Sequence, residues 1–426
     1  MTDTVAVPDG AAQPGGMAEA LRPRDAADVA EAVAQAAASG EGLELLGGGS
    51  KRGFGRPPRG RPLVLSALSG VLEYEPAELV LTALAGTPLG EVEALLDAQR
   101  QMLAFEPVGW RGLFGGEAGA RTGRPASEST LGGTLACNLA GPRRVRAGAA
   151  RDHFLGFAAV NGWGDAYKAG AKVVKNVTGY DLCKLQAGAL GTLSVLTEVT
   201  VKVLPRPEME RTLLVSVAEP GAAVRLMAAA LNSPHEVSAA AYVPAGSSMV
   251  ATGVGGPAVA LRIEGYAPSV AMRSTAVTAL AAAMAGRLAW LEAAPSAALW
   301  RAVGEVEALG AASADVVWRL STAPSEAPAV MAAIRAAVPE AAFLLDWGGA
   351  LLWTALPGGS EPGPVRAALR GGHATLVRAP AAMREVVPVF QPEPEAVAAL
   401  SRRVKAQFDP GGVLNPGRMR EEAGRG

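Results

Sequence analysis

A glycine-rich stretch, LLGGGSKRGFGRP at residues 45–57, has the composition of a phosphate-binding loop. Three consecutive glycines let the backbone approach a ligand closely and adopt positive φ angles. Successive backbone N–H groups can then surround phosphate oxygens, while Ser50 offers a hydroxyl and Lys51 a positive charge. The stretch lacks the ending of a nucleoside-triphosphate loop and the strand–GxGxxG–helix setting of a Rossmann unit. It therefore predicts a pyrophosphate site of another kind, with a plain glycine-rich turn as the alternative.

A second candidate is STLGGTLACNLA at residues 129–140, where two glycines lie beside hydroxyl side chains and Asn138. A helix that begins here would direct backbone N–H groups at a polar ligand. A tightly packed helix is the alternative.

Four arginines follow within nine residues: Arg143, Arg144, Arg146 and Arg151. Guanidinium groups pair well with phosphate, with an anionic cofactor or with acidic groups of a protein partner. A solvated basic loop is the simpler interpretation.

Composition excludes several classes of protein. Half of the 426 residues are apolar, 19% are charged and the net charge is −1, which favours a globular protein of two to three domains over a disordered or nucleic-acid-binding one. The only cysteines are Cys137 and Cys183, too few for a disulfide framework or an iron–sulfur cluster, so a reducing cytoplasm fits best. No metal site is expected.

No secretory signal or membrane span is expected either. The first 16 residues have no basic region followed by an apolar run. The alanine-rich segment 267–300 is interrupted by Arg273, Arg287 and Glu292, and so lacks the ~18 uninterrupted apolar residues of a transmembrane helix. Membrane contact, if any, would be peripheral and come through a partner.

The elements that position the glycine loop follow from hydrophobic periodicity. The pattern predicts a helix over 25–39, a strand over 43–46 that leads into the loop, and a helix over 89–100 with Thr87 as its cap. A long strand is expected at 194–204. Beyond Pro205 and Pro207, strand candidates alternate with alanine-rich helices, which predicts an α+β unit whose antiparallel sheet has helices on one side. These candidates are 213–217, 237–243, 259–264, 316–321, 342–346 and 351–355. A last helix is expected over 395–408.

Taken together, these motifs resemble the FAD-binding family that includes vanillyl-alcohol oxidase and the para-cresol methylhydroxylase (PCMH) flavoprotein. The glycine loop is similar to its pyrophosphate loop, STLGGTLA to its second flavin loop, and FDPGGVLNPGRM (408–419) to its C-terminal signature. Within that family, the motifs GPRR…RDHFLGF, VVKNVTGYDL, VVWRLS and LDWGGALLW are most similar to those of the FAD-binding subunits of bacterial glycolate oxidases.

The resemblance implies an α+β fold made of a two-part PCMH-type FAD-binding domain and an α+β cap domain with an antiparallel sheet. Residues 1–16 would be a flexible tail, 17–205 the FAD-binding domain, 206–394 the cap domain, and 395–426 a segment that returns to the FAD domain.

The resemblance also assigns cofactor contacts. Relatives with covalently bound flavin carry a histidine in the glycine loop, whereas this chain has Ser50 and Lys51, so FAD is expected to be non-covalent. The residues expected to bind it are Gly47, Gly48, Gly49, Ser50, Lys51, Pro107, Thr130, Leu131, Gly132, Gly133, Asn138, Gly188, Gly191, Val195, Thr197 and Asn415.

The catalytic residues are less evident. Oxidation of an α-hydroxy acid needs a base for the hydroxyl proton and a clamp for the carboxylate. The three histidines are far apart in sequence, and His153 in a flavin-side motif is the best candidate among them. Arg319 and Asp346 are the cap-domain candidates for facing the flavin, with an internal ion pair between them as the alternative.

We therefore consider three functions for this chain. The chain is a flavin subunit of a glycolate oxidase complex, oxidising glycolate to glyoxylate together with a catalytic flavoprotein subunit and an iron–sulfur subunit. Alternatively, it is an autonomous FAD-dependent hydroxy-acid or alcohol oxidoreductase, or a structural subunit with a vestigial flavin site.

Overall fold

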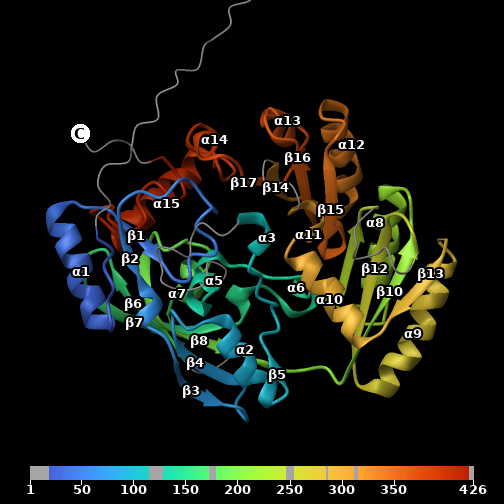
Figure 1. The fold of residues 1–426 in the computed structure, drawn as a ribbon, viewed down its shortest axis with the longest axis horizontal. Coiled ribbons are helices and arrows are strands. Elements are labelled where there is room, and N and C mark those ends of the chain that lie inside the picture. The colour runs from blue at the N-terminus through green and yellow to red at the C-terminus, as the bar shows by residue number, and fades with distance from the viewer. Residues whose placement is uncertain are drawn as a thin grey trace, which may run out of the picture.

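The strands form separate sheets on the two sides of the molecule (Figure 1). The computed structural model describes residues 19–114, 128–171, 179–245, 254–284, 286–310 and 315–421. The expected tail 1–16 and the first residues of the VVKNVTGYDL motif lie outside the described residues.

The first half of the chain contains two small pairs of strands and one larger sheet. Strands β1 (Leu43–Leu46) and β2 (Arg61–Val64) pair in parallel. The five-stranded antiparallel sheet has the order β3-β4-β8-β6-β7, and β5 pairs with β9. The bounds of these strands are β3 Val71–Glu75, β4 Val80–Leu84, β5 Gln101–Met102, β6 Phe154–Asn161, β7 Ala166–Gly170, β8 Ser194–Lys202 and β9 Leu204–Pro205.

Helices cover these sheets, and capping residues in the sequence set where the first of them begins and ends. Helix α1 (Ala26–Ser39) begins at Asp25, whose carboxylate accepts hydrogen bonds from two backbone N–H groups, and it ends at Gly40 with φ 71°. The prediction that Thr87 caps the next helix is wrong, because Pro88 occupies the cap position. The hydroxyl of Thr87 instead donates a hydrogen bond to the carbonyl oxygen of Leu84. The other helices here are α2 Leu89–Ala98, α3 Arg111–Phe114, α5 Leu131–Cys137, α6 Arg144–Ala147 and α7 Leu182–Gln186.

The second half contains one eight-stranded antiparallel sheet in the order β13-β10-β12-β11-β15-β16-β14-β17. One face packs against α8, α9 and α12 through a large apolar core. The bounds are β10 Met209–Ser216, β11 Ala239–Val243, β12 Ala258–Gly265, β13 Leu288–Leu291, β14 Val316–Ser321, β15 Ala342–Asp346, β16 Leu351–Leu356 and β17 His373–Arg378. The helices are α8 Pro220–Leu231, α9 Ala267–Ala282, α10 Ala293–Gly304, α11 Glu307–Gly310, α12 Ala327–Ala337, α13 Gly363–Ala367, α14 Ala381–Val386 and α15 Glu395–Phe408.

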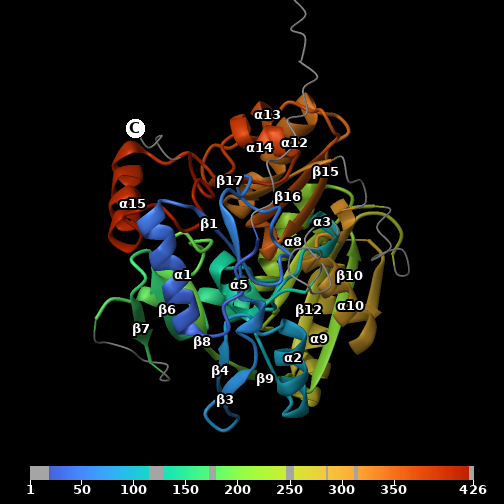
Figure 2. The same ribbon diagram turned by 60° about the vertical axis from the view of Figure 1, so that its left-hand side comes forward.

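The opposite face of the eight-stranded sheet packs on the first half of the chain. A second apolar cluster joins residues of both halves, including Phe54 and Trp110 from the first half and Val317 and Trp353 from the sheet. After β17 the chain returns, and α15 lies beside α1 and β1 (Figures 1 and 2). The α+β fold class and the antiparallel sheet of the cap domain are thus confirmed.

No helix within the described ranges combines the length and the apolar character that crossing a membrane requires.

Candidate functional site

The glycine loop follows β1 directly and packs against the start of α5. A Cβ built on Gly47 would lie 2.5 Å from Thr130 Oγ1, and one built on Gly48 would overlap the carbonyl oxygen of Glu128. Gly49 has φ 77°, a conformation that glycine adopts without strain. Because these glycines have no side chain, the loop can pack directly against residues 128–130.

The beginning of α5 is a defined helix N-terminus. Thr130 is its cap and accepts a hydrogen bond from the Gly133 backbone N–H at 3.2 Å. A Cβ on Gly132 would lie 2.6 Å from the Cβ of Ala85, so a larger residue could not occupy that position without displacing β4. Small residues thus bring α5 close to the sheet, beside the glycine loop.

The C-terminal segment holds the glycine loop from another side. Asn415 accepts a hydrogen bond from Leu45 N at 2.8 Å and donates to the Leu190 carbonyl at 2.7 Å. Arg418 donates to the carbonyl oxygens of Arg52 and Arg56 at 2.7 and 2.8 Å. Residues remote in sequence therefore fix the conformation of the loop.

A cleft of about 130 Å³ lies between these segments. The predicted cofactor residues that line it are Gly47, Gly48, Gly49, Ser50, Lys51, Thr130, Gly132, Gly133, Gly191, Val195 and Asn415.

Lys51 is the main electrostatic feature of this cleft. Its ammonium group donates to the hydroxyls of Ser129 and Ser50 at 2.6 and 3.1 Å. Burial lowers the pKa of Lys51 to about 8, although Cys137 and Glu305 act in the opposite direction. Burial likewise lowers the pKa of Arg418 to about 10. The half-buried Lys51 and the buried Arg418 beside a glycine cradle fit the pyrophosphate of a dinucleotide cofactor, whose negative charge would stabilise them.

Five other predicted cofactor residues do not line this cleft: Pro107, Leu131, Asn138, Gly188 and Thr197. Leu131 is fully buried in the apolar core. Asn138 ends α5 with φ 49°, and its side chain accepts a hydrogen bond from the Arg151 backbone. Pro107 lines a separate charged cleft between the two halves. For Leu131 and Asn138, the observed contacts serve the protein framework.

Arg319 and Asp346 lie on the face of the eight-stranded sheet that is turned to the first half. They line one narrow cavity together with Trp110 and Trp353, and it has about 10 Å³ of volume, the size of a site for a single water molecule. No ion pair joins Arg319 and Asp346 within 4.0 Å among the described residues, so the ion-pair alternative is wrong. Asp346 instead accepts the backbone N–H of Trp347 at 2.7 Å.

Asp346 makes stability depend on pH in a testable way. Burial raises its pKa from 3.8 to about 7, despite the hydrogen bond from Trp347 that lowers it. Because the folded state binds this proton more tightly, folding loses stability as pH rises from about 4 to 7, and the loss is complete above pH 7. We expect Asp346→Asn, which is always neutral, to be more stable than the wild type at pH 8 by on the order of 4 kcal/mol.

Urea unfolding at several pH values checks this expectation, with Asp97→Asn on the exposed face of α2 as the control. Parallel pH profiles of the wild type and Asp346→Asn between pH 4 and 8 would contradict it.

His153 is not brought to either cavity. It is 3% exposed, its Nε2 bonds to the Ala147 carbonyl at 2.8 Å, and its ring packs on Phe105 with centroids 5.5 Å apart. Burial lowers its pKa. The histidine is a core residue, and its observed contacts are with the protein framework.

The four clustered arginines do not form one surface. Arg143 is 7% exposed, whereas Arg146 makes an exposed ion pair with Glu236 and Arg151 lies near Asp152. Arg144 lies over the ring of Trp347. A single basic docking patch, one of the interpretations of the sequence, is therefore wrong.

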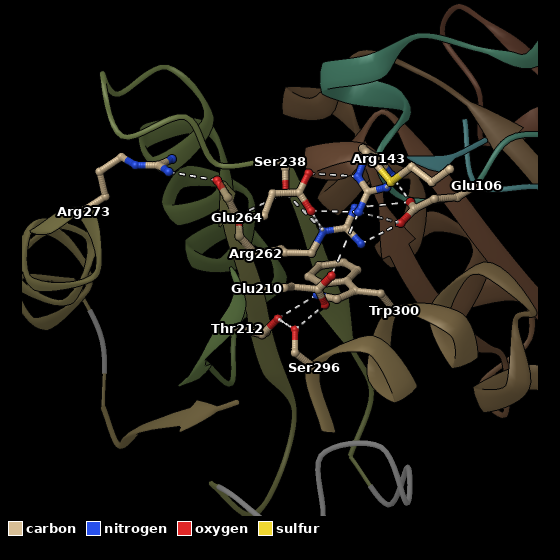
Figure 3. Close-up of polar contacts among 11 residues, drawn as sticks. Glu106, Arg143, Glu210, Thr212, Ser238, Arg262, Glu264, Arg273, Ser296 and Trp300 are labelled. Carbon is tan, nitrogen blue, oxygen red and sulfur yellow. Dashed lines mark hydrogen bonds and ion pairs between the residues drawn. The ribbon is translucent and has the colours of Figure 1, made fainter. Parts of the chain in front are cut away.

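Arg143 instead belongs to an ion-pair network that joins the two halves (Figure 3). It pairs with Glu264 of β12 through two hydrogen bonds of 2.9 and 2.7 Å, while its backbone N–H donates to Glu106. Arg262 of β12 donates to both oxygens of Glu106 at 2.7 and 3.2 Å. Burial would raise the pKa of Glu106, but Arg262 and Arg143 outweigh it and lower the pKa. The network therefore links the two halves through buried ion pairs.

Sequence reasoning missed two arginines that support the loop. Arg418 lies in the FDPGGVLNPGRM motif, three residues after Asn415, and a basic residue within a glycine–proline turn was an available signal. Arg384 of α14 donates to the carbonyls of Gly53 and Gly55 at 3.0 and 2.9 Å. Nothing in its local sequence distinguishes it from an ordinary surface arginine.

Within the described part of the chain, no group of three or more His, Cys, Asp and Glu side chains is placed to hold a metal ion.

Comparison with known proteins gives concordant results. A family model for an FAD binding domain matches residues 18–170. The chain is 34% identical over 394 residues to the glycolate oxidase subunit GlcE of Escherichia coli (strain K12), which covers 92% of this chain and 96% of GlcE. It is 38% identical over 117 residues to the glycolate oxidase subunit GlcD of Bacillus subtilis (strain 168), which covers 28% of this chain and 23% of GlcD.

A solved structure of p-cresol methylhydroxylase with substrate bound matches with a TM-score of 0.68 over 94% of this chain and 88% of that chain, at 14% identity. At this identity the match concerns the fold alone, and it confirms the expected PCMH-type architecture.

Proposed function

Since this chain belongs to the family of FAD-dependent oxidoreductases that includes the glycolate oxidase subunit GlcE, we propose that it is the FAD-binding subunit of a glycolate-oxidising complex. In this proposal the complex oxidises glycolate to glyoxylate. FAD, when bound, supplies the two-electron acceptor for such an oxidation.

The observation that carries the proposal is the glycine-loop cleft, which Lys51 lines without an ion pair to any described residue. Lys51, Ser50 and the glycine loop would hold the pyrophosphate, and the N-terminus of α5 would face the same group. The loop has no histidine, which supports a non-covalent cofactor.

We also propose the division of the chain that the sequence indicated. Residues 17–205 and 395–426 would form the FAD-binding unit, and 206–394 the cap domain. The contacts of Asn415 and Arg418 with the glycine loop support the assignment of the C-terminal segment to the FAD side.

The proposed partners are a catalytic flavoprotein subunit and an iron–sulfur subunit. The similarity of part of the chain to GlcD supports a complex of related flavoproteins. With only Cys137 and Cys183 in the sequence, this chain lacks the four thiolates of an iron–sulfur cluster, so electrons would pass to another subunit. We infer a cytoplasmic location, with any membrane contact made by those partners.

Co-expression with the two partner subunits tests the proposal. We expect the purified complex to reduce an electron-accepting dye with glycolate, and the isolated chain to bind stoichiometric FAD but to reduce the dye at less than about a tenth of that rate. Acid precipitation should release the flavin into the supernatant.

Other results would favour the alternatives. Full glycolate turnover by the isolated chain would indicate an autonomous oxidoreductase. A chain that assembles into the active complex but carries no FAD would be a structural subunit with a vestigial site. Flavin that remains with the acid precipitate would contradict non-covalent binding.

A further inference from the structure

Strand β13 (Leu288–Leu291) is the last strand of the eight-stranded sheet and pairs on one side only, with β10. Within the described residues, no other backbone or side-chain group bonds to its outer side. It lies at the outer margin of the second half, away from the first half (Figure 1). The backbone groups on the outer side of β13 are therefore available to another strand.

The hydrogen bonds with β10 determine which backbone groups of β13 point outward. Ser216 N donates to the Arg287 carbonyl oxygen at 2.9 Å, so the backbone of Arg287 faces β10. Because this direction alternates along a strand, Ala289 also faces β10, whereas the N–H and C=O groups of Leu288 and Trp290 point to the open side. These two residues present the donors and acceptors for one more strand.

The other edge strands of the two large sheets are protected against such pairing. Strand β3 carries Glu73 and Glu75, and β7 carries Lys168. The outer side of β17 is covered, because Leu376 N donates to the Val389 carbonyl oxygen at 2.8 Å. Charged residues and covering segments are common ways to prevent strand addition at an edge.

Strand β13 has none of these protections. Its sequence is Leu-Ala-Trp-Leu, without a charge or a proline, and its pairing with β10 has no bulge. All four side chains are half-buried. An apolar edge of this kind indicates a surface that another strand covers.

The strand is complementary to itself in an antiparallel arrangement. With Ala289 opposite Ala289 of a second copy, Leu288 lies opposite Trp290 of that copy, and each such pair exchanges both of its backbone hydrogen bonds. The two alanines then form a non-hydrogen-bonded pair, in which Cα atoms approach to about 4.5 Å and small side chains fit best. Leu288 and Trp290 both pack on the apolar core under the helices, so their contact across the axis would extend that core.

Charges at the two ends of β13 favour the same arrangement. Arg287, just before the strand, is exposed and makes no ion pair within the described part of the chain. Glu292, just after it, is also exposed and pairs with Arg211. An antiparallel pair brings the basic end of one strand beside the acidic end of the other, whereas a parallel pair would bring like charges together.

We propose that the open edge of β13 binds the β13 edge of a second copy of this chain. The two eight-stranded sheets then form one continuous sheet across a two-fold axis. This contact is independent of the function proposed above. It lies on the side of the molecule away from the glycine loop (Figure 1), so it leaves the cleft free.

Analytical ultracentrifugation of the purified full-length chain tests the contact. We expect the wild type to pass from monomer to dimer between about 1 and 100 µM, and Leu288→Pro to weaken dimerisation by about tenfold or more. Proline at this position removes only an outward N–H group, so the hydrogen bonds between β13 and β10 remain. Leu288→Lys should have the same effect, because a lysine on an edge strand opposes strand addition.

Leu72→Lys is the matched control. Leu72 is 52% exposed on the edge strand β3 of the other large sheet, and its replacement should leave dimerisation unchanged. Hydrogen exchange of the wild type gives a second readout at the site itself. The amides of Leu288 and Trp290 should exchange at least about tenfold more slowly in the dimer than in the monomer. A melting curve shows whether each variant is folded.

Several results would overturn the contact: a wild-type chain that stays monomeric up to about 100 µM, normal dimerisation of folded Leu288→Pro and Leu288→Lys, or equal weakening by Leu72→Lys. If neither Leu288 variant folds, the exchange of the wild type decides. Amides of Leu288 and Trp290 that are protected only in a complex with a different subunit would show that this edge binds another protein, and would refute a second copy as its partner.

Discussion

Gly48→Ala is expected to abolish retention of FAD and to lower the free energy of unfolding by roughly 1–3 kcal/mol, the usual cost of an extra methyl group in a tightly packed place. The new Cβ would overlap the carbonyl oxygen of Glu128, closer than any Cβ contact found in folded proteins. That oxygen belongs to the backbone, so no side chain can rotate away to make room. The glycine loop must move from the N-terminus of α5, and the two segments that line the cleft separate.

Flavin absorbance per protein and a melting curve measure this result. Gly90→Ala in α2 is the control, since a Cβ there meets no atom within 4 Å and alanine favours a helix over glycine by up to about 1 kcal/mol. A Gly48→Ala protein that purifies with its full flavin complement and an unchanged melting temperature would refute the close packing of the loop on residues 128–130.

Among changes in the ion-pair network between the halves, Arg262→Leu should be the most destabilising. We expect it to lower the free energy of unfolding by about 3–5 kcal/mol. The side chain is 1% exposed, and its loss would leave Glu106 and Glu264 to share Arg143 alone. The apolar replacement can pack on Trp300 but cannot neutralise a buried carboxylate. Urea unfolding at pH 7 measures the change.

The exposed pair Arg146–Glu236 offers the control, because Arg146→Gln should cost no more than about 1 kcal/mol. The pH dependence adds a second check. The pKa of Glu106 is lowered from 4.5, so its ionic contribution is present above that pH and is lost as the pH falls through the lowered value. The difference in the free energy of unfolding between the wild type and Arg262→Leu should therefore become smaller at acidic pH. Equal costs of Arg262→Leu and Arg146→Gln would contradict the role of the network.

Local patterns in the sequence predicted several strands well. A short apolar run before three glycines indicated β1 and its loop, and alternating residues located β14 and β15 at Val316–Ser321 and Ala342–Asp346. Strand β13 was missed because Leu288–Leu291 lies inside an alanine-rich segment that resembles continuous helix. It is an edge strand whose position depends on pairing with β10.

The roles of individual charged residues could not be predicted in the same way. Arg143 lies in a run of arginines that is typical of a solvated loop, and only its contact with Glu264, 121 residues away, makes it internal. The sequence indicated Arg319 and Asp346 as candidates for facing the flavin, with an ion pair between them as an alternative that only the fold excludes. Pairings between distant segments depend on the fold and leave no periodic signal in the sequence.

The contact between Asn415 and the loop also constrains biogenesis. The hydrogen bond from Leu45 N to the Asn415 side chain joins residues 370 positions apart. At a synthesis rate of about 5–20 residues per second, the ribosome needs roughly 20–75 s to make the intervening chain. During that time the glycine loop lacks the residues that fix its shape, so a nascent chain should be unable to hold the cofactor tightly. Tight flavin binding is then expected to follow the synthesis of Asn415, near the end of translation.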